Sequence, residues 1–382
     1  MANETTTDVI KVMRLLRDRR NVLISGAPGT GKSRLLANVA KAFETSSFVD
    51  QAAAGPVHVP GAAVAIPEQV PGDMQAELQD VLPAPARTNR QVFRTTFHQN
   101  SKYREFVSGL VPVTTPGETG FRVMPGTLYR ASEHAKAEEG ASLLVIDEIN
   151  RGPAVQVFGG SIVAIEPDKR LADDNGVRPL TQFFEIVDPD TGNVVEYALP
   201  EHLYILAAMN QADTSVEPLD VAFLRRWANF RLQPAESVLT EFFGLGSPAG
   251  EIPEQANAAS DVYRAAVRAW QAINDRVRLG RGAEFQIGHG IFLIGGGAPP
   301  QDLDDAKQFV AEAWSYVQAH VDEVFFGDIR GIAAVLNVIG GPNNHLYLLE
   351  ETTFADEPRL DLTGPNEVTA DNIYPLLRAV IG

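Results

Sequence analysis

A glycine-rich segment near the start of the chain has the residue types and spacing of a phosphate-binding loop. Residues 26–33 fit the pattern G-x-x-x-x-G-K-S, in which glycines let backbone N–H groups turn inward around phosphate oxygens. We expect Lys32 to reach the β- and γ-phosphates of a nucleotide and Ser33 to bind Mg²⁺. An accidental match in a turn is disfavoured, because an apolar run precedes the segment and a helical pattern follows it. The candidate nucleotide-binding residues are Gly26, Ala27, Pro28, Gly29, Thr30, Gly31, Lys32, Ser33 and Arg34.

Two acidic residues follow a strongly apolar run farther along the chain. The run at 142–146 ends in Asp147 and Glu148. A strand buried in a parallel sheet delivers its last side chains to the crevice at the carboxyl edge of the sheet. We therefore expect Asp147 to hold Mg²⁺, directly or through water, and Glu148 to polarise an attacking water. Alone, this pattern would equally describe a solvated strand end, so the assignment depends on the glycine-rich loop.

Three more polar residues complete the candidate catalytic set. Asn210 follows an apolar run at 203–208, where it could orient the lytic water or simply begin a turn, as asparagine often does. Arg225 and Arg226 lie beside large apolar residues. Arginine stabilises the charge of a transferring phosphoryl group, often from a neighbouring subunit, and a surface salt-bridge pair is the alternative. The catalytic candidates are Glu148, Asn210, Arg225, Arg226 and Lys32, and the metal candidates are Ser33 and Asp147.

The histidines and the absent cysteines restrict the other kinds of chemistry. His98, His202 and His289 are scattered and lack metal-ligand spacing, so we predict ordinary polar or core roles for them. The chain contains no cysteine. It can therefore form neither disulfides nor thiolate metal sites, and it has no cysteine nucleophile.

The candidate residues require a sheet whose strands end at one edge. Hydrophobic spacing predicts strands at 21–25, 142–146 and 203–208 and helices at 8–18, from about 32, and at 127–138. Alternating strands and helices are typical of an α/β fold, with a parallel-sheet αβα core. After the core, helical spacing predominates.

The composition of successive segments predicts the domain boundaries. We expect a large α/β domain at 1–233, a linker at 234–257 rich in proline, glycine and acidic residues, and a smaller, mainly helical domain at 258–382. Within the large domain, an inserted loop is predicted at about 50–90 and a hairpin at about 171–200.

The overall charge and hydropathy limit the possible partners. The formal charge of −17 repels nucleic acid and anionic membranes, so contact with DNA would need a local basic patch or a partner. No apolar run reaches the roughly 20 residues that span a bilayer, and the N-terminus lacks a signal-peptide pattern. We expect a cytoplasmic protein with no membrane contact.

The order of the motifs resembles the AAA+ motor domain of the McrB family, the nucleotide-hydrolysing subunit of McrBC restriction systems. The resemblance spans roughly residues 15–340. The similar blocks are residues 20–33, 96–112, 146–152, 165–170, 203–213, 285–289 and 323–328.

Roles for several residues follow from this resemblance alone. Asn210 takes the sensor-1 position, and Arg225 and Arg226 take the arginine-finger or sensor position. The helical domain takes the place of the family's lid. The resemblance also implies a Mg²⁺-dependent hydrolase of ATP or GTP, a homo-oligomeric ring expected to be a hexamer, and a McrC-like nuclease or other effector as partner in an anti-phage restriction system.

The sequence also departs from the family pattern. Gln211 and Thr214 replace the threonine and arginine of the family's M-N-T-A-D-R stretch, and Leu224 replaces the first residue of its three-arginine run. In some family members such a stretch is linked with GTP preference, so the choice between ATP and GTP stays open. Only about 20 residues precede the first predicted strand, too few for a DNA-reading module. We therefore expect DNA contact to be indirect or through the ring.

Two other functions compete with this reading. A MoxR-like ATPase that remodels another protein complex shares the stretch at 147–151, although the blocks at 97–99 and 285–289 favour the McrB family. A nucleotide-gated scaffold without hydrolysis is the third hypothesis. The presence of every expected catalytic residue argues against it.

Overall fold

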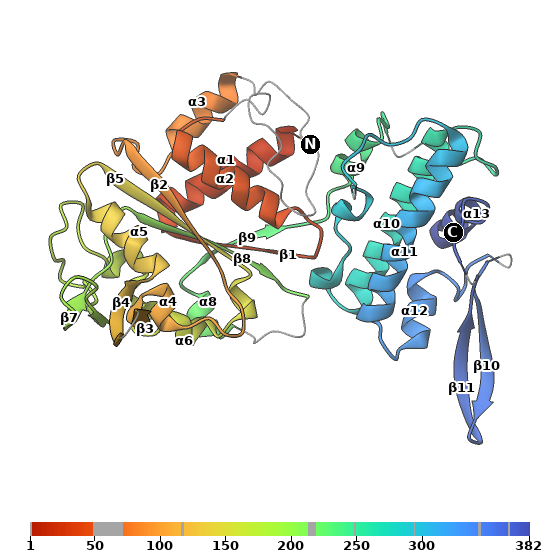
Figure 1. The fold of residues 1–382 in the computed structure, drawn as a ribbon. Helices are drawn as coiled ribbons and strands as arrows, with labels where there is room; N and C mark the ends of the chain where they lie inside the picture. Colours follow the sequence, from red (N-terminus) through yellow and green to blue (C-terminus); the bar gives the residue numbers. More distant parts are fainter. Residues whose placement is uncertain are drawn as a thin grey trace.

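The computed structural model describes residues 2–48, 72–115, 118–212, 219–247, 250–293, 295–342, 345–365 and 367–382. Two bodies lie end to end, one built on a layered sheet and the other mainly helical (Figure 1). Edge strand β9, Ala228–Leu232, leads from the first to the second. None of the helices among the described residues is long and apolar enough to cross a membrane.

A five-stranded parallel sheet forms the centre of the first body. Its strand order is β2-β5-β8-β1-β9, and every neighbouring pair is parallel. The other four strands are β1 Asn21–Gly26, β2 Asn89–Thr96, β5 Gly140–Asp147 and β8 Leu203–Asn210. The parallel sheet and the helical second body confirm the predicted α/β fold class.

Both faces of the sheet are covered, which explains why its strands are continuous apolar runs. In β1, Val22 and Ile24 pack against one set of helices, whereas Leu23 faces the opposite set. The first set comprises α1 Ala2–Arg19, α2 Lys32–Thr45 and α3 Gly72–Val81. The second comprises α4 Tyr103–Phe106, α5 Thr127–Lys136, α6 Ala154–Phe158, α7 Ser161–Ala164 and α8 Val221–Leu224.

A separate hydrophobic core holds the second body together. Trp314 is fully buried at its centre. Its helices are α9 Glu236–Phe242, α10 Ala259–Gly280, α11 Leu303–Val324, α12 Ile329–Val335 and α13 Ile373–Ile381. Part of the segment predicted as linker therefore forms α9, because Leu239 and Phe243 provide an apolar face that packs into this core. The division into domains at 1–233 and 258–382 stays a prediction.

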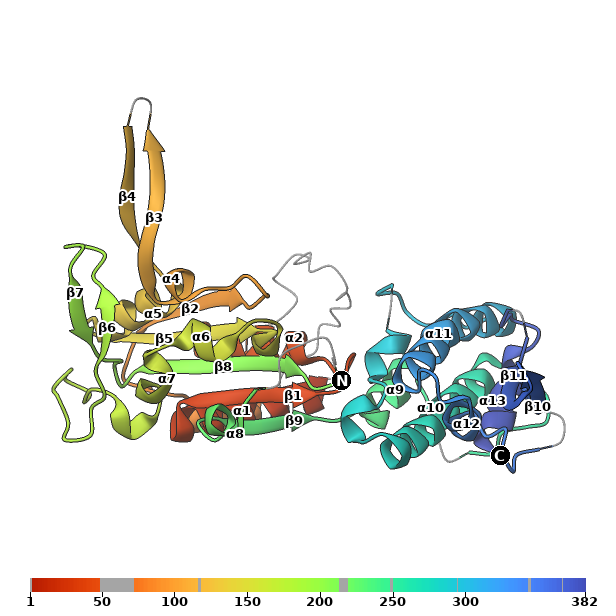
Figure 2. The same ribbon diagram turned by 90° about the horizontal axis from the view of Figure 1, so that it is seen from below.

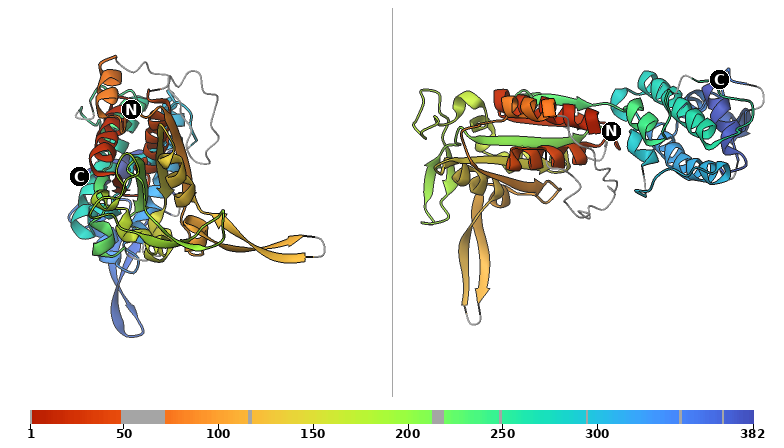
Figure 3. Two further views of the ribbon diagram at one scale, coloured as in Figure 1. Left: turned by 90° about the vertical axis from the view of Figure 1, so that its left-hand side faces the viewer. Right: turned by 90° about the horizontal axis from the view of Figure 1, so that it is seen from above.

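Three hairpins stand apart from the layers. β3 Ser108–Thr115 and β4 Glu118–Pro125 project far from the first body (Figure 2). β10 Leu348–Phe354 and β11 Glu357–Thr363 extend from the second body in another direction (Figure 3). Neither ribbon was predicted. β6 Phe184–Val187 and β7 Val194–Tyr197 form a hairpin within the predicted range of about 171–200.

The inserted loop predicted at about 50–90 is partly helical. Helix α3 occupies its second half, because Leu78 and Val81 pack into the core beneath α1 and α2. Residues 49–71 lie outside the described residues. Four 3₁₀ turns complete the described elements: Ile149–Arg151, Pro167–Lys169, Ala283–Phe285 and His289–Phe292.

Candidate nucleotide-binding site

The glycine-rich loop connects the end of β1 to the start of α2. Gly29 and Gly31 have φ angles of 74° and 88°, a left-handed conformation that favours glycine. A Cβ on Gly26 would lie 2.5 Å from the Leu232 carbonyl oxygen of β9. Gly31 precedes the first turn of α2 and offers no capping side chain. The backbone N–H groups of that turn and the helix dipole thus favour an anion here.

Lys32 is held against the loop itself. Its Nζ donates to the carbonyl oxygens of Gly26 at 3.0 Å and Ala27 at 2.9 Å. Burial lowers the pKa of Lys32 from 10.5 to about 8, although Glu148 and Asp147 partly oppose this shift. A phosphate group in the loop would replace the carbonyl contacts with a stronger charge-assisted pair.

The acidic residues and Asn210 meet at the same edge of the sheet as the loop. The strand register places Asn210 beside Gly26. Asn210 Nδ2 donates to Glu148 Oε1 at 2.8 Å, and Arg151 Nε lies 3.4 Å from Glu148 Oε2. Asp147 Oδ1 accepts from the backbone N–H of Glu148 at 3.0 Å. The structure therefore brings together Lys32, Asp147, Glu148 and Asn210, as the sequence predicts.

The oxygen donors present suit a magnesium ion. Ser33 is exposed at the start of α2, and Asp147 is half-buried at the end of β5. Hydroxyl and carboxylate oxygens are hard ligands, and Mg²⁺ usually takes one or two of them together with phosphates and waters. Within the described ranges, no cluster of three or more His, Asp or Glu residues could hold a metal without such help.

The two predicted arginines have different surroundings. The Arg226 side chain is only 8% exposed, and its Nε lies 2.9 Å from Glu166 Oε1. Its carbonyl oxygen also accepts from Asn21 Nδ2 at 3.2 Å. Arg225, by contrast, is exposed. These contacts point to a structural role for Arg226, so of the two predicted catalytic arginines only Arg225 is placed to reach another molecule.

Arg225 lies near the amino ends of the sheet strands, whereas the phosphate-binding loop of the same chain lies at their carboxyl ends. The register pairs Val22 with Ala228 and Gly26 with Leu232, so Arg225 precedes the amino end of β9. Five strand residues separate the two edges by roughly 17 Å. Arg225 therefore does not join the group formed by Lys32 and Glu148 in this chain.

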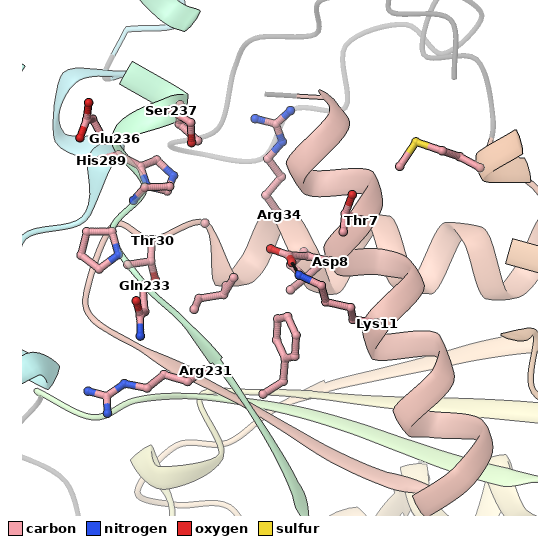
Figure 4. A pocket seen from close by; sticks show the side chains of 18 of the residues that line it. Thr7, Asp8, Lys11, Thr30, Arg34, Arg231, Gln233, Glu236, Ser237 and His289 are labelled. Atoms are coloured by element: carbon pink, nitrogen blue, oxygen red, sulfur yellow. Dashed lines mark hydrogen bonds and ion pairs between the residues drawn. The ribbon is translucent and has the colours of Figure 1, made fainter. Parts of the chain in front are cut away.

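A cavity of about 990 Å³ opens beside the loop (Figure 4). Several elements contribute to its polar lining: Thr7, Asp8 and Lys11 from α1, Thr30, Gly31 and Arg34 from the loop and α2, Arg231 and Gln233 from β9 and the connection after it, and Glu236, Ser237 and His289 from the helical body. Burial lowers the pKa of Arg34. The cavity is large enough for the base and sugar of a nucleotide whose phosphates occupy the loop.

The helical body contacts the phosphate-binding loop directly through a turn at 288–290. The backbone N–H of Gly288 donates to the Pro28 carbonyl at 3.0 Å, and that of Gly290 donates to the Gly29 carbonyl at 2.9 Å. His289 between them lines the cavity. The ordinary polar or core role predicted for His289 stays a prediction, although its Nδ1 accepts from the backbone N–H of Ala235 at 3.2 Å. The block at 285–289 was the available signal.

The sequence pattern relates Gln211 and Thr214 to the choice between ATP and GTP. Gln211 is exposed just after β8, and Thr214 lies outside the described residues. Their positions therefore leave the choice between ATP and GTP open.

A sequence match to a known protein family is consistent with this arrangement. The model described as an AAA domain of the dynein-related subfamily matches residues 79–227. The matched range contains Asp147, Glu148, Asn210 and both arginines, and it begins after the phosphate-binding loop.

Two curated restriction proteins are similar to this chain. The Type IV methyl-directed restriction enzyme EcoKMcrB subunit of Escherichia coli (strain K12) is 27% identical over 232 residues, which cover 60% of this chain and 39% of that protein. The Type II restriction enzyme BsuMI component YdiS of Bacillus subtilis (strain 168) is 28% identical over 215 residues, or 55% of this chain and 56% of that protein. The chain thus spans 39% and 56% of the length of these relatives.

A solved structure from Cytophaga hutchinsonii, provisionally described as an ATPase, was also matched. The match covers 86% of this chain and 79% of the other at 12% identity, with a TM-score of 0.32.

Proposed function

We propose that the chain is an AAA+ protein of the McrB-like type and a Mg²⁺-dependent hydrolase of ATP or GTP. The observation that carries the proposal is the meeting of Lys32, Asp147, Glu148 and Asn210 at one sheet edge, beside the glycine-rich loop. The AAA domain match and the restriction subunits to which the chain is similar support the same chemistry.

In the proposed reaction, Glu148 activates a water molecule for attack on the γ-phosphorus. The bond between the water oxygen and phosphorus forms as the bond from phosphorus to the bridging oxygen breaks, and a water proton passes to Glu148. Asn210 orients Glu148 through its 2.8 Å hydrogen bond. Lys32 and the backbone of the loop hold the phosphates.

The metal would be bound by Ser33 and Asp147. Bound there, Mg²⁺ would neutralise charge on the β- and γ-phosphate oxygens. The role assigned to these two side chains is to supply oxygen ligands to the metal.

We further propose that the chain works in a ring, expected to be a hexamer, with a McrC-like nuclease or other effector. The names of the relatives, a subunit and a component of restriction enzymes, support a partner. The exposed Arg225, far from its own loop, supports a site completed by a neighbour. Hydrolysis would then drive DNA translocation or remodelling in a restriction or anti-phage system of the cytoplasm.

Steady-state hydrolysis of ATP and GTP, measured over a range of protein concentrations with and without Mg²⁺, tests the proposal. We expect Mg²⁺-dependent turnover whose specific rate rises with protein concentration. Lys32→Ala should weaken nucleotide binding, whereas Glu148→Gln should spare binding and lower kcat by at least about a hundredfold. Equal rates for wild type and Glu148→Gln would overturn the proposed reaction.

A further inference from the structure

The catalytic carboxylate proposed above lies in a strained turn, which neighbouring contacts must hold in place. Glu148 has φ 51° and ψ 46°, the left-handed region that is unfavourable for a residue with a Cβ. Such strain persists only where the surroundings over-determine the conformation. Ile149 supplies one contact, because its side chain is fully buried in the hydrophobic core. Asn150 supplies a second contact, directed at the end of β8.

The Asn150 side chain is buried, and one hydrogen bond defines its position. Asn150 is 5% exposed, and its Nδ2 donates to the backbone carbonyl oxygen of Asn210 at 2.9 Å. The reverse orientation of the amide would set Oδ1 against that carbonyl oxygen, so this bond also fixes the orientation. Among the residues that the structure describes, nothing donates to Oδ1. A buried amide satisfied on one side alone is unfavourable for stability, which points to the bond with Asn210 as the contribution of this side chain.

This bond joins two strands beyond the end of their ladder. The pairing of β5 with β8 ends at Ile146 and Ala207, so Asn210 lies three residues past the last pair. On its other side, Asn210 still pairs with Gly26 of β1. Asn150 therefore ties the end of β8 to the turn after β5 at a point that the ladder no longer reaches.

We propose that Asn150 is a positioning residue for hydrolysis, which holds Asn210 where the Asn210 side chain can orient Glu148. The contacts form a closed circuit. Asn150 donates to the Asn210 carbonyl at 2.9 Å, and Asn210 Nδ2 donates to Glu148 Oε1 at 2.8 Å. The turn then returns the chain from Glu148 to Asn150. This inference rests on the proposed function and adds to it a residue that acts through Asn210.

Loss of the Asn150 bond should affect the chemical step more than nucleotide binding. The Glu148 carboxylate could then move away from the attacking water, and a misplacement of about 1 Å can cost roughly a hundredfold in rate. Binding depends on Lys32 and the phosphate-binding loop, so it should change little. A positioning residue is thus distinguished by a fall in kcat at nearly constant affinity.

A double-mutant cycle tests whether Asn150 acts through Asn210. The kcat for ATP and GTP is measured in the full-length chain at saturating nucleotide and protein. We expect Asn150→Ala to lower kcat roughly ten- to a hundredfold, and the double variant with Asn210→Ala to be no slower than Asn210→Ala alone. Losses that multiply in the double variant would overturn the proposal, since a residue that acts independently of Asn210, or a general weakening of the fold, gives that result.

Asn337 in the helical body provides the matched control. Its Nδ2 donates to the Ala379 backbone carbonyl at 2.9 Å, the same kind of bond at the same length. Asn337→Ala should lower the free energy of unfolding but leave kcat unchanged. If Asn150→Ala does not fold, Asn150→Asp keeps the shape of the side chain and loses the donor, and it should show the same fall in kcat.

The remaining measurements separate this role from the proposed function. Nucleotide affinity, measured by calorimetry in the Glu148→Gln chain, should change less than about twofold on adding Asn150→Ala. A loss of affinity as large as the loss of kcat would overturn the positioning role. An unchanged kcat in Asn150→Ala, where Glu148→Gln is inactive, would overturn it as well. Hydrolysis by Glu148→Gln at the wild-type rate would overturn the proposed function instead.

Discussion

Lys32 is a single residue whose charge is set by its surroundings. Burial lowers its pKa to about 8 in the folded, nucleotide-free chain, against 10.5 unperturbed. Between these values the unfolded chain holds a proton that the folded chain has released. This residue's contribution to stability therefore rises with pH over that window and is unfavourable below it.

We expect nucleotide affinity to fall as the pH rises above about 8, because a neutral Lys32 no longer attracts phosphate. Dissociation constants measured from pH 7 to 9.5 in the Glu148→Gln chain check this. The Lys32→Ala variant of that chain is the control. The explanation fails if Lys32→Ala shows the same pH dependence.

We expect Arg226 to contribute to the stability of its own chain and not to hydrolysis by a neighbouring subunit. Arg226→Ala removes the ion pair with the 26% exposed Glu166, leaving that carboxylate without its partner. We expect a loss of about 1–3 kcal/mol in the free energy of unfolding, measured by urea denaturation. Arg225→Ala, at an exposed neighbouring position, should change it by less than about 0.5 kcal/mol. Similar losses in both variants would contradict the distinction.

Among the elements, the turn at 288–290 packs closely on the phosphate-binding loop through backbone atoms. Gly288→Ala would force a Cβ into the backbone of Gly29, so the turn would have to leave the phosphate-binding loop. We expect nucleotide affinity to fall at least about tenfold, because the turn both contacts the phosphate-binding loop and carries His289, a lining residue of the cavity. Calorimetry measures it, and Gly297→Ala, where a Cβ has open space, is the control. Unchanged affinity in Gly288→Ala would show that the contact is dispensable.

The strands β1, β5 and β8 could be predicted from the sequence because each is an apolar run that ends in a motif. The ribbons β3–β4 and β10–β11 could not. Their side chains are largely in solvent, and Phe121 and Phe354 are 75% and 71% exposed, so neither strand pair shows the alternation that marks a half-buried strand. Helix α9 escaped prediction because it has only seven residues.

Within the site, sequence could predict the residues whose position follows from strand order. Asp147, Glu148 and Asn210 lie together because β5 and β8 are neighbours in a parallel sheet. The difference between Arg225 and Arg226 could not be predicted, since it depends on Glu166, 60 residues away. The position of His289 in the cavity wall likewise involves a hydrogen bond from Ala235, 54 residues earlier in the chain, and it could not be predicted either.

At the scale of the whole molecule, Arg225 should act on a neighbouring chain. We expect Arg225→Ala and Glu148→Gln each to be inactive alone, and a mixture of the two to recover measurable hydrolysis. In the mixture, an intact Arg225 can meet an intact Glu148 across a contact between chains. Phosphate release measured at equal total protein checks this. A mixture that co-assembles by light scattering and stays inactive would exclude the role in trans.

The separation of Arg225 from the loop also constrains symmetry. A contact that joins the amino edge of one sheet to the carboxyl edge of the next uses two different surfaces, so it cannot be a two-fold contact between identical patches. When subunits joined by such heterologous contacts form an open row, one contact surface stays unoccupied at each end of the row. Both surfaces of every subunit are occupied only when the assembly closes into a ring, which requires a fixed rotation between neighbouring subunits. A small change in that rotation would give open filaments instead.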